Sequence, residues 1–138
     1  MQSAARAYMK TQVNTTSQES LVLMLYDGAL NFLKSARERM LEKDYAQKGI
    51  LISNALDVIA ELDGSLNREK GGEVSENLHK LYILCHSRLL KANMNMDVEQ
   101  LDEVITMLSD LRSAFAQIMP KGPAQPNVSP KLAGSFAR

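Results

Sequence analysis

Apolar side chains recur every three or four positions in four stretches of the chain, which is the repeat of an amphipathic α-helix. In the first stretch the repeat falls on Leu21, Leu25, Ala29, Phe32 and Ala36. The other three stretches show the same spacing with mostly Leu, Ile and Val at the repeating positions. The sequence therefore predicts four helices, over residues 16–42, 44–66, 73–92 and 97–118.

Start and stop signals support these boundaries. A capping residue stands at Thr16, Asp44 and Asp97, and each is followed three residues later by Glu or Gln. The pair Gly71-Gly72 is expected to break the helical pattern between the second and third helices, because glycine is unfavourable inside a helix. Pro120 must end the fourth helix.

The connections between the four predicted helices are short, which forces neighbouring helices to run antiparallel. We therefore expect an all-α fold, an antiparallel up-down-up-down four-helix bundle. Residues 1–15 precede the bundle and can form a short helical or extended cap segment. Residues 119–138 contain four prolines and are expected to be a flexible tail.

Composition narrows the class of protein. The chain has 138 residues, one domain's worth, and a single cysteine, which cannot form an intrachain disulfide. It contains neither an apolar run long enough to span a membrane nor a signal peptide, so a cytoplasmic protein without membrane insertion is expected. The net charge is zero, but residues 16–118 hold 11 basic and 16 acidic side chains. An acidic body repels phosphate backbones, which argues against nucleic acid as the partner.

Two predicted helices carry more apolar surface than one bundle face requires. When each helix is wound at 100° per residue, several apolar side chains fall outside the arc that faces the core. Such stripes are typical of partner binding. They could instead form a weak homodimer, or be covered by residues 1–15, where Tyr8 and Val13 offer apolar side chains. The surplus positions are Leu23, Tyr26, Leu30, Leu33, Ile83 and Leu90.

The residues that could carry chemistry do not assemble into a site. His79 and His86 are seven positions apart on one helix, too far apart to share a metal ion. Cys85 falls on the core-facing arc and cannot pair with His86 beside it. We expect no enzyme activity, no metal and no cofactor. Asp27 and Arg88 are charges near the core arcs, and they could form a salt bridge or remain solvated separately.

Five segments of the chain together form a distinctive ordered set: Tyr8 with Thr11–Thr15, Leu25–Ala29, Glu69–Glu73, Asn77–Tyr82 and Leu89–Asn93. In their order and spacing these segments resemble the FliS flagellin export chaperones. The likeness extends from about residue 5 to residue 118, with Phe115 where that family often has Trp.

The resemblance implies a cytosolic four-helix bundle without catalytic activity. It implies that the protein binds the disordered C-terminal segment of flagellin, prevents premature polymerisation, and docks on the FlhA-type export gate protein of the flagellar type III secretion apparatus. It also implies that the N-terminal segment, with Tyr8, covers part of the binding groove when flagellin is absent. We hypothesise that the six surplus residues bind flagellin and that Tyr8 and Val13 belong to a displaceable lid, with Tyr8 as a contact for the gate.

Two other functions are compatible with the residues alone. A self-associating helical adaptor would use the same apolar stripes for a different partner. A phosphotransfer domain would use an exposed histidine on a four-helix bundle, and His86 is the candidate. The spacing around His86 departs from that of such domains, so this alternative ranks last.

Overall fold

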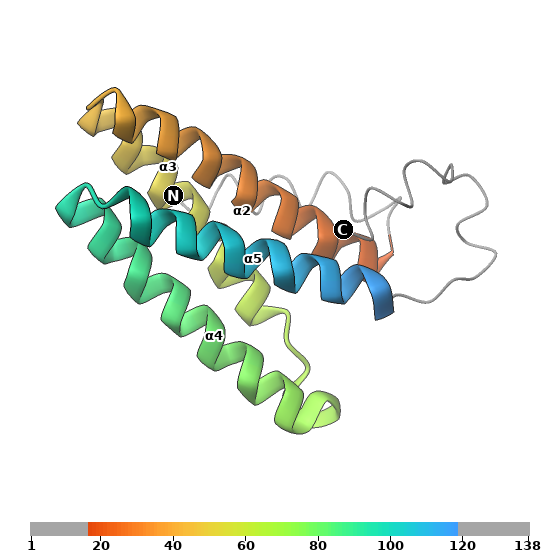
Figure 1. Cartoon of the computed structure of the whole chain (residues 1–138). Helices are drawn as coiled ribbons and strands as arrows, with labels where there is room; N and C mark the ends of the chain where they lie inside the picture. The colour runs from red at the N-terminus through yellow and green to blue at the C-terminus, as the bar shows by residue number, and fades with distance from the viewer. Residues whose placement is uncertain (1–16, 119–138) are drawn as a thin grey trace.

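The computed structural model describes residues 17–118, and this part of the chain is helical with no strand. The chain direction reverses from each helix to the next (Figure 1). The all-α fold predicted from the sequence is confirmed. The helices are α2 (Gln18–Leu41), α3 (Tyr45–Gly64), α4 (Arg68–Asn95) and α5 (Val98–Ile118).

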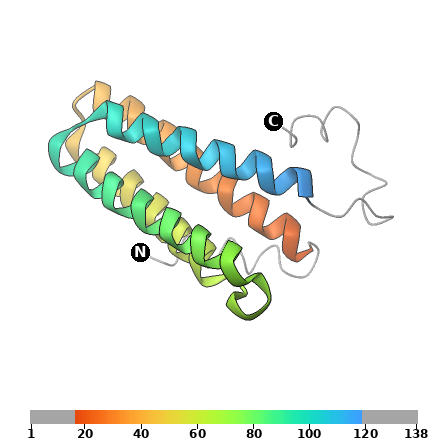
Figure 2. The same cartoon turned by 60° about the horizontal axis from the view of Figure 1, so that its bottom comes forward.

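The four helices form a ring in which α2 packs against α3 and α5, and α4 packs against the same two helices. Figure 2 shows α5 lying beside α2 along most of its length, with α4 and α3 on the other side of the bundle. Each helix therefore has two neighbours, and α2 and α4 face each other across the centre. Within the described residues, no helix is long and apolar enough to cross a membrane.

A single cluster of apolar side chains fills the centre of the ring. Every helix contributes to this cluster at positions three or four residues apart, as the sequence repeat requires. The largest aliphatic side chains that are almost fully enclosed are Leu25, Leu33, Ile52, Leu62, Leu89, Leu101 and Leu108.

Polar side chains cap the helices close to the predicted positions. Ser17, rather than Thr16, caps α2 by accepting a hydrogen bond from the backbone N–H of Ser20. Asp44 and Asp97 accept equivalent bonds at the starts of α3 and α5. Each bond satisfies one of the backbone donors that a helix leaves free in its first turn.

The start of α4 differs from the sequence expectation. The helix begins at Arg68, five residues before the predicted start, because Asn67 caps an additional turn and accepts a bond from Lys70 N–H. The break expected at the glycine pair is therefore a kink inside α4, where Gly72 has φ 54° and ψ −126°. The Ser75 hydroxyl secures the extra turn by donating to the carbonyl of Asn67 at 3.1 Å.

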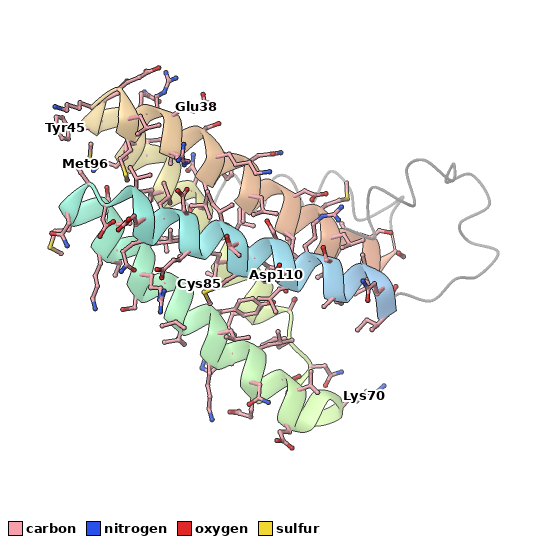
Figure 3. All side chains as sticks on the ribbon, viewed as in Figure 1. Glu38, Tyr45, Lys70, Cys85, Met96 and Asp110 are labelled. Carbon is pink, nitrogen blue, oxygen red and sulfur yellow. The ribbon has the colours of Figure 1, made fainter. Side chains whose placement is uncertain are left out.

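A buried lysine ties α3 to the last turns of α4. Lys48 Nζ donates to the backbone carbonyl of Asn93 at 2.9 Å and to its side-chain oxygen at 2.6 Å. A cation at a helix C-terminus is favoured by the helix dipole, and this one also satisfies a carbonyl that the helix leaves free. Figure 3 shows Tyr45 and Met96 at this end of the bundle and Lys70 at the opposite end.

We predict opposite effects of alanine at two glycines. Gly72→Ala forces a side chain into a backbone conformation that only glycine adopts readily, which should lower the free energy of unfolding by about 1–3 kcal/mol. Gly49→Ala is the control, because Gly49 lies within α3 and no described atom comes within 4 Å of an added Cβ. This change should raise stability by about 0.5–1 kcal/mol. Urea denaturation measures both, and equal effects would contradict the assignment of the kink.

Candidate functional site

The structure buries the four α2 residues that were predicted to be surplus apolar surface. Their exposed fractions lie between 0 and 6%. The expectation that they form an exposed stripe is therefore wrong. Their part in binding a partner is taken up under the proposed function. The four residues are Leu23, Tyr26, Leu30 and Leu33.

Tyr26, Leu30 and Leu33 belong to the central apolar cluster, and two ion pairs show that α5 lies along one flank of α2. Arg37 Nε donates to Asp102 at 2.7 Å, and Asp27 forms an ion pair with Arg112. Leu23 and Leu30 lie four residues before and three residues after Asp27, so they share the flank of α2 that faces α5. A helix with neighbours on two flanks needs a wider apolar arc than a helix with one, and the apparent surplus on α2 meets that need.

Tyr26 connects three helices at the centre of the bundle. Its hydroxyl shares a hydrogen bond with that of Tyr82 on α4, with the two oxygens 2.6 Å apart. Its ring lies 6.5 Å from the ring of Phe115 on α5. Burial raises the pKa of both tyrosines, so both hydroxyls remain neutral and can share the bond. Tyr26 is thus a structural residue of the core.

The other two predicted surface residues are exposed, and both lie on α4. Ile83 and Leu90 are 55% and 44% exposed, and Met94, one turn further on, is 79% exposed. Positions separated by seven and eleven residues lie on one side of a helix, so these three side chains form a line, which we call the α4 apolar line. Met94 was missed from the sequence because the helix was expected to end at residue 92, whereas it extends to Asn95.

Asp27 and Arg88 form neither the mutual salt bridge nor the separately solvated charges that were considered from the sequence. Asp27 and Arg88 do not bind each other, because Asp27 binds Arg112 while Arg88 binds Glu103 on α5. Arg112 is buried, and its Nη2 also lies 3.3 Å from Asp27 Oδ2. These ion pairs join α5 to the helices on either side of it.

The histidines and the cysteine occupy unrelated positions. His79 Nδ1 lies 2.8 Å from Asp63 on α3, whereas His86 is exposed. Cys85 is fully buried, and burial raises the pKa of its thiol to about 11. Within residues 17–118, no three His, Cys, Asp or Glu side chains are grouped to hold a metal ion. The remaining predicted site residues, Tyr8 and Val13, lie outside the described residues.

A comparison with known protein families connects this bundle to a function. The family model described as "Flagellar protein FliS" matches residues 1–122. The chain belongs to the FliS family. The resemblance seen in the five sequence segments is therefore confirmed, and this FliS family member can be compared with named relatives.

Its relatives are named as flagellar secretion chaperones. The protein of that name from Salmonella typhimurium is 37% identical over 122 residues, covering 88% of this chain and 90% of the relative. FliSB of Pseudomonas aeruginosa is 36% identical, covering 78% of this chain and 85% of the relative. FliS of Bacillus subtilis is 33% identical, covering 85% and 86% respectively. The similarity thus extends over most of each protein.

We predict that the two central tyrosine hydroxyls depend on each other. Tyr26→Phe or Tyr82→Phe alone leaves the other hydroxyl buried without its partner, which should cost about 1–3 kcal/mol. The double replacement removes both polar groups and should cost less than either single replacement. Urea denaturation of the three variants tests this, and additive losses in the double variant would contradict it.

We predict that the Cys85 thiol is unreactive in the native protein. Because its pKa is raised to about 11 and its side chain is enclosed, a thiol reagent at about pH 8 should meet almost no thiolate. Labelling should become fast and complete in denaturant. Since the chain has one cysteine, the signal is unambiguous, and rapid labelling of the native state would overturn the prediction.

Proposed function

We propose that this FliS family member is a flagellar secretion chaperone of the cytosol. In this role it binds the disordered C-terminal segment of flagellin, prevents premature polymerisation, and delivers the subunit to an FlhA-type export gate. No catalytic step and no cofactor is required. Family membership and the names of the relatives support the chaperone role, and flagellin and the gate are the finer parts of the proposal.

The observation that carries the proposal is the α4 apolar line. Ile83, Leu90 and Met94 expose large apolar side chains on one side of a helix whose other side is in the core. Binding a disordered segment costs ordering entropy, and burial of apolar surface is the main compensation. A rigid helix that already presents such surface can supply that compensation without rearranging.

The four buried α2 residues have a supporting part in this proposal. Tyr26, Leu30 and Leu33 belong to the central apolar cluster and Leu23 is also buried, so these residues hold the bundle in shape. We therefore assign direct contact to Ile83 and Leu90. Tyr26, Leu30 and Leu33 contribute through the core, and Leu23 is a buried residue of the same helix.

Residues 1–15 complete the proposal as a displaceable lid. They adjoin the start of α2, and Tyr8 and Val13 give them side chains that could cover an apolar surface until flagellin arrives. In this scheme the displaced segment, and Tyr8 in particular, becomes free to contact the export gate. The family resemblance is the support for this part.

We predict that Leu90→Asp weakens binding of the flagellin C-terminal segment at least about tenfold in calorimetry, because it places a charge in an apolar interface. Val74→Asp is the matched control, since Val74 is 66% exposed on the same helix. Val74 lies sixteen residues from Leu90, or about 160° around α4. The control should bind like the unaltered protein.

Both variants change an exposed side chain, so their circular dichroism and melting temperatures should match those of the unaltered chain. Equal binding by all three proteins would refute the assignment of the α4 apolar line. Failure of the unaltered protein to bind any flagellin segment would refute the proposed function itself.

A further inference from the structure

Two lysines border the α4 apolar line on the side away from α3. Lys80 and Lys91 are exposed, and neither has a salt-bridge or hydrogen-bond partner among the described residues. By helical geometry, both lie about 60–100° around α4 from Ile83 and Leu90. They are eleven residues apart, about 16 Å along the axis, which matches the distance from Ile83 to Met94.

The opposite side of the apolar line is closed by α3. His79 binds Asp63, and Asn93 binds Lys48, so the polar groups between the two helices already have partners. Between residues 80 and 95 the chain has no acidic side chain, and Arg88 on the far side of α4 is bound to Glu103. Alongside residues 80–95 the exposed charge on this side of α4 is therefore positive, although Glu76, one turn before Lys80, and residues 16–118 as a whole are acidic.

Charge indicates what can cover this face. We call the border formed by Lys80 and Lys91 the lysine edge. Residues 1–16 and 119–138 contain five basic side chains and no acidic one, so the lid proposed for residues 1–15 can pack on apolar side chains but brings no carboxylate to this edge. An occupant that complements it has an apolar stripe at the helical repeat and acidic side chains along one border of that stripe. An amphipathic helix laid along an exposed helix face binds in this way.

We propose that the α4 face binds a helical stretch of the flagellin client whose acidic side chains lie along Lys80 and Lys91. This inference rests on the proposed function and adds the chemistry and orientation of the bound segment. The α4 apolar line supplies most of the affinity. The lysine edge sets the orientation of the bound client helix on α4 and speeds its association. The pairs form at the rim of the interface, where they are screened by salt.

The test uses the full chain and the flagellin C-terminal segment in titration calorimetry. Lys80→Glu combined with Lys91→Glu should raise the Kd about three- to tenfold at low salt, about 0.05 M, and the difference should shrink near 1 M. Lys34→Glu combined with Lys70→Glu is the control, because it changes the net charge equally at exposed positions away from the face. The control should bind within about twofold of the unaltered protein.

A second measurement changes the client instead. A flagellin segment with its Asp and Glu replaced by Asn and Gln should bind the unaltered chain more weakly and should no longer distinguish it from the double-glutamate variant. Together the two measurements form a double-mutant cycle for the edge.

Other results would overturn the inference in separable ways. If the double-glutamate variant binds like the control while Leu90→Asp still abolishes binding, the flagellin function stands and the lysine edge has no role. If light scattering shows a dimer that Leu90→Asp converts to monomer, the occupant is a second copy of the chain. If the unaltered chain does not bind flagellin, the proposed function fails together with this inference.

Discussion

Each helix in a ring of four must bury apolar side chains against two neighbours, and this constraint decides which apolar residues remain for a partner. On α2 the two flanks face α3 and α5, and the ion pair of Asp27 with Arg112 fixes the second contact. Leu30 is buried in the central cluster on this flank, and Leu23 is buried as well. On α4 the same requirement is met by Tyr82, Cys85 and Leu89, so the α4 apolar line is left over.

Polar groups inside the bundle give the packing its register. Apolar side chains alone would tolerate sliding of one helix along another, because hydrophobic burial is not directional. The Tyr26–Tyr82 hydrogen bond crosses the centre, and the bonds of Lys48 to Asn93 set α3 against the end of α4. Displacing either contact would leave buried polar groups without partners, which is costly.

A rigid bundle that exposes the α4 apolar line suits the proposed client, which is disordered before binding. The client must lose conformational entropy, so a chaperone that also had to fold or open would lose further affinity. The α4 apolar line is held in place by a helix whose opposite side is in the core. The line is therefore already formed in the free protein, and under the proposal above the lysine edge would orient the client without making release slow.

The sequence by itself determined the four helical segments, the caps at Asp44 and Asp97, and most of the apolar core, because these follow from local repeats and from residue types at helix ends. The five ordered segments also pointed to the family. The exposure of Ile83 and Leu90 was predictable for the same reason, since a helical wheel placed them opposite the core. The extra turn at Asn67 was missed because the glycine pair reads as a break, although it accommodates a kink.

Only the tertiary structure decided which surplus residues stay on the surface. A helical wheel shows one helix at a time, so it could not reveal that α5 packs along the flank of α2 that contains Asp27 and Leu30. For the same reason it left the partners of Asp27 and Arg88 open, and these became Arg112 and Glu103. Which charge meets which depends on the register between helices distant in sequence, and that register is set by the packing of the whole ring.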